Sequence, residues 1–196
     1  MKSKILSVKH SKHGVLHSEA LFLCSIIENN SIETIIESGT CLASSTEYFA
    51  KCFPEKNIIT VDRLVNEGRG TYEIASEKLK KYNNVKQVIG DSFELVPLFV
   101  QKSRNICLFI DGPKGMDAIR LMKKCVTEQV KVISFHDFTS EQIKSFVPSG
   151  FKIVSYKEHM DIYGDRSSKD FMNSNSVCSL SGRYKNRENI VVMVRE

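Results

Sequence analysis

The stretch Thr34-Ile-Ile-Glu-Ser-Gly-Thr-Cys-Leu-Ala-Ser-Ser45 joins a short β-branched run to an acid, a glycine and several small hydroxyl residues. The β-branched run predicts a buried strand over residues 34–39, and residues 46–52 have the pattern of a helix that follows it. A tight turn between a strand and a helix start exposes backbone amides and hydroxyl groups. We therefore expect a small polar ligand to bind at this turn.

The same turn argues against a dinucleotide. The Gly-x-Gly-x-x-Gly spacing that lets the backbone approach a pyrophosphate is absent, because no second glycine follows Gly39 within the turn and Ala43 stands where one would be expected. A nicotinamide-dependent oxidoreductase on a similar sheet therefore stays only an alternative.

Strand-like and helix-like segments alternate along the rest of the chain. Because parallel neighbours need helical crossovers, the alternation predicts an α/β fold with a doubly wound, mostly parallel sheet. Two late strands, 150–156 and 189–195, could pair antiparallel at one edge and bring the sheet to seven strands. The earlier strands are expected at 34–39, 57–62, 85–89, 105–111 and 130–135, and the helices at 19–28, within 67–81, and at 92–100 and 117–127.

Two local expectations concern these helices. Ser18 is expected to cap the helix over 19–28, and Ile74 and Leu79 are expected to be the apolar contacts of the helix within 67–81.

An acid stands at the carboxyl end of each of the first five strands. In open parallel sheets these ends face the ligand crevice, so the acids should share one rim. Gathering them costs desolvation and repulsion, which a cationic ligand, a metal or hydroxyl-rich partners would offset. The acids are Glu37, Asp62, Asp91, Asp111 and Asp137.

Length and composition bound the remaining possibilities. The 196 residues fit a single domain, with residues 1–17 as a polar tail or substrate flap and residues 157–188 as either a lid loop or a solvated basic loop. His10, His13 and His17 are expected in a solvated tail rather than at a metal. The net charge of +5 is typical of a solvated face, and it favours an acidic or phosphorylated substrate over nucleic acid. With no apolar run of about 18 residues, neither a membrane span nor a signal peptide is expected.

The six cysteines include no Cys-x-x-Cys pair. This usage indicates reduced thiols and predicts a cytoplasmic protein.

With Glu37-x-Gly39-x-x-x-Ala43-x-Ser45, Asp62, Gly90-Asp91 and Asp111 in place, the sequence resembles class I S-adenosylmethionine-dependent methyltransferases. The resemblance is closest to the catechol and caffeoyl-CoA O-methyltransferase branch and to related enzymes that modify sugars and antibiotics. It covers nearly the whole chain and implies a Rossmann-like methyltransferase fold.

The resemblance implies which residues neighbour the cofactor S-adenosylmethionine. The first acid and glycine would hold its methionine part, the acid after the second strand its ribose, and the Gly-Asp pair its adenine. The implied cofactor residues are Glu37, Gly39, Thr40, Ser45, Asp62, Arg63, Asp91, Ser92 and Asp111.

The chemistry implied by the resemblance lies at the ends of the fourth and fifth strands. Asp111-x-x-Lys114 matches a motif whose acid binds a divalent cation and whose lysine helps to deprotonate an acceptor hydroxyl. The branch has Asp-Asn after its fifth strand, whereas this chain has His136-Asp137. Asp111, His136 and Asp137 are therefore the expected ligands of Mg²⁺ or another divalent cation. Asp111, Lys114 and His136 are the expected catalytic residues, and His136 could be a third ligand, the general base or a purely structural histidine.

The expected function is methyl transfer to a small hydroxylated acceptor, such as a sugar or a glycan precursor. A hydroxyl is a poor nucleophile, and a cation with a neighbouring base lowers the cost of making it an alkoxide. A homodimer is an open expectation for the assembly. A protein that keeps the fold and binds the cofactor without turnover is a further alternative.

Overall fold

The computed structural model describes residues 1–9, 14–63, 71–156 and 189–196. The strands are β1 (Thr34–Ser38), β2 (Asn57–Asp62), β3 (Val85–Ile89), β4 (Ile106–Ile110), β5 (Val130–His136), β6 (Phe151–Val154) and β7 (Ile190–Arg195). They form one seven-stranded sheet in the order β3-β2-β1-β4-β5-β7-β6. Strands β1 to β5 are parallel, and β7 runs antiparallel to both β5 and β6. The expected sheet and its antiparallel edge pair are confirmed.

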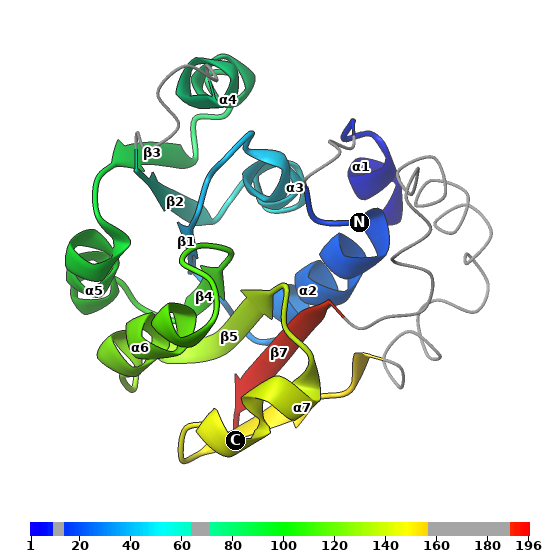
Figure 1. Ribbon diagram of the computed structural model, residues 1–196. Helices are drawn as coiled ribbons and strands as arrows, with labels where there is room; N and C mark the ends of the chain where they lie inside the picture. Colours follow the sequence, from blue (N-terminus) through cyan, green and yellow to red (C-terminus); the bar gives the residue numbers. More distant parts are fainter. Residues whose placement is uncertain (10–13, 64–70, 157–188) are drawn as a thin grey trace.

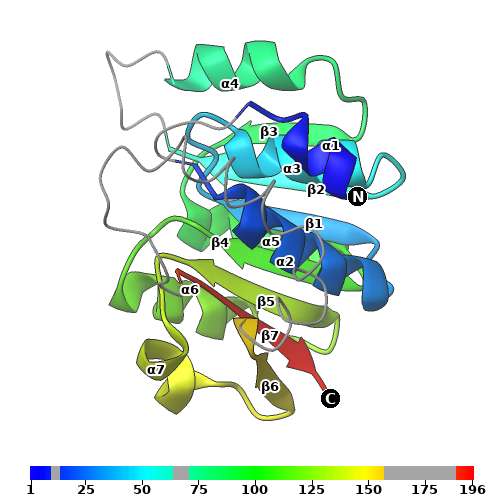
Figure 2. The same ribbon diagram turned by 90° about the vertical axis from the view of Figure 1, so that its right-hand side faces the viewer.

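Helices cover both faces of this sheet. In Figures 1 and 2, α2 and α3 lie on one face and α5 and α6 on the other. The helices are α1 (Lys2–Leu6), α2 (His17–Asn29), α3 (Ser44–Cys52), α4 (Thr71–Leu79), α5 (Ser92–Lys102), α6 (Met116–Cys125) and α7 (Ser140–Ile143), and a 3₁₀ turn, η1 (Lys144–Phe146), follows α7. None of the described helices is long and apolar enough to cross a membrane.

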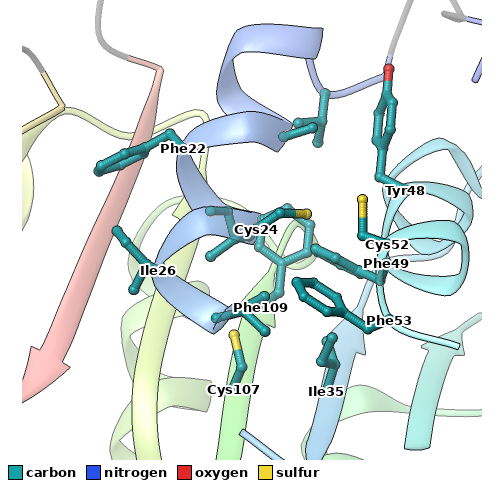
Figure 3. Close-up of a cluster of buried hydrophobic side chains, with 14 of the residues drawn as sticks. Phe22, Cys24, Ile26, Ile35, Tyr48, Phe49, Cys52, Phe53, Cys107 and Phe109 are labelled. Atoms are coloured by element: carbon teal, nitrogen blue, oxygen red, sulfur yellow. The ribbon is translucent and has the colours of Figure 1, made fainter. Parts of the chain in front are cut away.

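The alternation of side chains on the central strand β4 explains why it is apolar throughout. Cys107 and Phe109 point to the cluster under α2 and α3, whereas Ile106, Leu108 and Ile110 point to the cluster under α5 and α6. Figure 3 shows the first cluster, in which the ring of Phe109 meets that of Phe49 edge to face, with 5.6 Å between the ring centroids. A strand buried on both faces must be hydrophobic at every position.

The first residues of the chain are packed on the fold rather than forming a polar tail, and the alternative of a substrate flap stays a prediction. Residues 2–6 form α1, which packs against α2 and α3, and Ile5 and Val8 are buried. His17 belongs to α2, where its side chain is buried and its Nε2 lies 3.0 Å from the carbonyl oxygen of Val8. His10 and His13 lie outside the described residues, as does the expected lid over 157–188.

Two predictions about helices were wrong in detail. Helix α2 begins at His17, one residue before Ser18. The hydrogen bond at its start is accepted by the side chain of Glu19, not of Ser18, and is donated by the backbone N–H of Leu16 at 2.8 Å. In α4, Ile74 is 48% exposed, and Ala75 and Leu79 are the buried residues. Neither difference changes the sheet, because helix ends and helix rotation depend on neighbours that a local pattern does not contain.

Strand order places the candidate site. From β1 the chain proceeds outward through β2 to β3 and then crosses back to β4 on the other side of β1, so the order reverses between β1 and β4. Ligands of open α/β sheets bind at the carboxyl ends of the strands at such a switch point.

Candidate active site

The turn after β1 is packed tightly against the turn after β4. The backbone N–H groups of Asp111 and Gly112 both donate to the carbonyl of Ser38, at 2.9 and 2.8 Å. Gly39 adopts a φ of +100°, and a Cβ there would lie only 2.7 Å from the amide nitrogen of Gly112. A glycine is therefore required, both by the positive φ and by the close approach of two backbones.

Glu37 lies beneath this turn. Its side chain is fully buried, and its two carboxylate oxygens accept from the hydroxyl groups of Ser45 and Thr46 at the start of α3. Burial raises the pKa of Glu37 to about 7, although hydrogen bonds from Ser45, Thr46 and Thr60 oppose the shift. Glu37 and Ser45, both predicted to neighbour the cofactor, thus bind each other and tie the strand to the helix.

Asp62 lies at the end of β2 and organises the outer side of the turn. Its carboxylate accepts from the backbone N–H of Cys41 at 2.6 Å and from that of Arg63 at 2.8 Å. Behind it, the hydroxyl groups of Thr40 and Thr60 are 2.6 Å apart. Asp62 is half-buried at the rim, where two vicinal hydroxyl groups of a ligand could reach it.

Asp91 and Ser92 follow β3 at the start of α5. Asp91 caps the helix by accepting from the backbone N–H of Phe93 at 2.7 Å, and it forms an ion pair with Arg63. Ser92 is buried, with its hydroxyl 2.7 Å from that of Ser38. The structure thus joins the turns after β1, β2 and β3 through side chains predicted to neighbour the cofactor and through Ser38, which was not predicted.

A shallow hollow opens beside Asp62. It is open to solvent. Thr40, Cys41 and Asp62 line one side and Gln87, Val88 and Ile89 of β3 another, and Arg63, Thr71 and Tyr72 complete the lining.

The second half of the rim is a cluster of charges after β4 and β5. Lys114 Nζ lies 2.5 Å from Asp111 Oδ1 and 2.7 Å from Asp137 Oδ2. His136 Nδ1 lies 2.9 Å from Asp111 Oδ1. One potential ligand atom each from Asp111, His136 and Asp137 lies within 4.8 Å of the others, which suits a divalent cation. The predicted metal and catalytic residues are brought together here.

The pairing in this cluster shifts the pKa of each group. Burial alone would raise the pKa of Asp111, but His136 and Lys114 hold it below its usual range. Asp137 likewise has a lowered pKa, because Lys114 and His136 offset its burial. Burial would lower the pKa of Lys114 and of His136, yet the carboxylates raise both, that of His136 to about 10. In the metal-free chain, both cations therefore hold their protons at neutral pH.

Two neighbours of this cluster were not identified from the sequence. Asn189, just before β7, donates from its side chain to Asp137 at 3.0 Å. Glu19 of α2 is 3% exposed, and its Oε2 lies 3.4 Å from His136 Nε2. The only signal for Glu19 is an acid at the start of a strongly apolar helical segment, because its partner is distant in the chain.

The fold can be compared with those of solved structures. No protein-family model and no curated protein matches the sequence. Solved structures match the fold, and those described below are all methyltransferases by name. The chain thus has the fold of the class I S-adenosylmethionine-dependent methyltransferases, and the fold implied by the sequence resemblance is confirmed.

Three particular structures illustrate the likeness. The O-methyltransferase TomG from Streptomyces achromogenes, solved with S-adenosylmethionine, is 14% identical with a TM-score of 0.59, over 93% of this chain and 81% of TomG. A candidate caffeoyl-CoA O-methyltransferase from Staphylococcus aureus is 16% identical with a TM-score of 0.54, over 90% and 82%. Precorrin-6y C5,15-methyltransferase from Geobacter metallireducens is 14% identical with a TM-score of 0.55, over 96% and 95%. Because the second and third of these names give different acceptors, the fold alone does not identify an acceptor.

Proposed function

We propose that this chain is an S-adenosylmethionine-dependent O-methyltransferase that acts on a small hydroxylated acceptor, such as a sugar or a glycan precursor. The observation that carries the proposal is the gathering of strand-end acids at the switch point of the sheet. Asp62 lies on one side of the turn after β1, and Asp111 and Asp137 lie on the other. A sulfonium nucleoside is a cation that carries vicinal hydroxyl groups, and both features suit an acidic rim.

In this proposal the cofactor extends over the turn after β1. Asp62 accepts the ribose hydroxyl groups, since a carboxylate offers two acceptor oxygens to two donors. Gly39 keeps the turn low enough for a ligand to lie across it, and Arg63, Asp91 and Ser92 shape the adenine side. Glu37 and Ser45 act from beneath by fixing the turn, because their polar atoms are already bound to each other.

The acceptor would lie beside Asp111, Lys114 and His136. Asp111, His136 and Asp137 would hold a divalent cation, which when bound supplies a Lewis acid that lowers the pKa of an acceptor hydroxyl. Lys114 Nζ, which contacts both acids, would first release its own proton to solvent and then, as the neutral amine, take the proton of the acceptor hydroxyl. A positioned proton-transfer group typically contributes about 10²–10⁴-fold to the rate, and in-line placement of the reactants about 7–11 kcal/mol. A cytoplasmic location and a homodimer remain predictions.

The proposal is tested by calorimetric titration of the full chain with S-adenosylhomocysteine. We expect binding, and we expect Asp62→Asn to weaken it about 10–100-fold, because a hydrogen bond to a charged group is worth about 1.5–3 kcal/mol. Asp117→Asn is the matched control, since Asp117 is an exposed acid of α6 that pairs with Arg120. No binding at millimolar ligand, or equal loss in both variants, would reject the proposal.

A further inference from the structure

Glu19 is a buried carboxyl that approaches the charged cluster from the helix layer. Its Oε2 accepts from the backbone N–H of Leu16 at 2.8 Å and lies 3.4 Å from His136 Nε2. Its other oxygen is buried and has no hydrogen-bond partner among the described residues. The cap of the helix uses only one of the two carboxylate oxygens. Burying the other oxygen without a hydrogen-bond partner costs free energy, and the cap does not explain that cost. The nearest charged group to this carboxylate across the helix layer is His136.

The imidazole of His136 lies between two carboxylates. Nε2 faces Glu19, and Nδ1 faces Asp111 at 2.9 Å on the side where Asp137 also lies. A carboxylate at Nε2 keeps a proton on that nitrogen, so that loss of the Nδ1 proton, which faces Asp111, would leave the lone pair of Nδ1 directed toward the position shared by the two aspartates. Histidines that bind metals commonly donate their second N–H to a carboxylate in this way, which orients the ring and strengthens the ligand.

The donor set also bears on the choice of metal. Mg²⁺ prefers oxygen ligands and retains several waters, whereas imidazole suits transition metals. We propose that Glu19 is a positioning residue that holds His136 with Nδ1 toward the cation position, so that the site selects a transition-metal dication such as Co²⁺ or Mn²⁺ over Mg²⁺. This inference rests on the proposed function, because it concerns the cation position of that site.

The experiment uses the full chain stripped of metal, with Co²⁺ and Mg²⁺ as the probes. Calorimetry measures the affinity of each cation, and the visible absorption of bound Co²⁺ reports a nitrogen ligand. We expect the wild-type chain to bind Co²⁺ at least about tenfold more tightly than Mg²⁺. Glu19→Gln should lose about 10–100-fold in Co²⁺ affinity, because the uncharged amide no longer fixes the ring. His136→Ala should change the absorption spectrum.

Glu28→Gln is the matched control, because Glu28 is an exposed glutamate of the same helix and undergoes the same change of charge. It should bind Co²⁺ as the wild-type chain does. Should Glu19→Gln fail to fold, as judged from its thermal melt, Glu19→Asp retains the charge but withdraws it by one methylene and should also lose affinity.

Three outcomes would overturn the inference: equal affinity of the wild-type chain for Mg²⁺ and Co²⁺, unchanged Co²⁺ affinity in the Glu19 variants, or no cation binding. Titration of the same samples with S-adenosylhomocysteine separates this inference from the proposed function. Co²⁺ binding that depends on Glu19 without nucleoside binding would support the metal site and reject the methyltransferase. Nucleoside binding without a preference for Co²⁺ would support the proposed function and reject the inference about the metal site.

Discussion

Glu37 shows how a single buried carboxyl can shape a site without lining it. It is fully buried, and hydroxyl groups of Ser45 and Thr46 occupy its two oxygens. Its position was predictable, because an acid at the end of an apolar strand is visible in the sequence. Its direction was not, because the hydroxyl groups that bind it become neighbours only when α3 folds back over β1.

The raised pKa of Glu37 predicts a pH dependence of stability. A carboxyl whose pKa is raised by folding stabilises the folded state fully below its unfolded value, and this contribution is lost as the pH rises through the folded value. The relevant window runs from pH 4.5 to about 7. At about 1.4 kcal/mol per pH unit, up to about 3 kcal/mol of stability is lost across it.

Glu37→Gln removes this ionisation. Urea unfolding at a series of pH values measures the free energy of unfolding of both proteins. Between pH 4.5 and 7.5, the value for the variant should rise by up to about 3 kcal/mol relative to that of the wild type. Parallel curves for the two proteins would contradict the prediction.

At the scale of elements, the decisive feature is the meeting of the turns after β1 and β4. The backbone N–H groups of Asp111 and Gly112 donate to the carbonyl of Ser38. This contact places the charged cluster after β4 and β5 next to the turn at Gly39. The glycine was visible in the sequence as part of a strand-to-helix turn. The reason for it was not, because Gly112 lies 73 residues further along the chain.

Gly39→Ala should destabilise the protein by about 2–4 kcal/mol, because the new Cβ meets the amide of Gly112 at 2.7 Å in a conformation with positive φ. Gly115→Ala is the control. Gly115 also has a positive φ, of +60°, but no atom lies within 4 Å of its added Cβ, so it should lose only about 1 kcal/mol. Urea unfolding measures both, and equal losses would show that backbone strain alone sets the cost.

The whole molecule is a sheet whose strand order reverses between β1 and β4, with helices on both faces. That reversal places the turn after β1 and the acids after β4 and β5 at one rim. A ligand that binds this rim binds only the folded chain, so its free energy of binding adds to stability.

S-adenosylhomocysteine at about a hundredfold excess over its Kd should therefore stabilise the fold by about 2.7 kcal/mol, which corresponds to a rise in Tm of about 5–11 °C for a chain of this size. Thermal melts with and without ligand measure the shift, and Asp62→Asn should reduce it. A comparable shift with NADH, and none with S-adenosylhomocysteine, would instead favour the nicotinamide-dependent alternative.

The sequence by itself determined the alternation of strands and helices, the strand-end acids and the glycine turn, because hydrophobic period and turn chemistry are local properties. It also placed Asp111, His136 and Asp137 at the ends of two strands that proved to be neighbours. Only the tertiary structure decided that Glu19 backs His136, that Glu37 lies under the turn and that residues 2–6 form a packed helix. These are contacts between segments far apart in the chain, and side-chain direction at such contacts is fixed by packing rather than by local pattern.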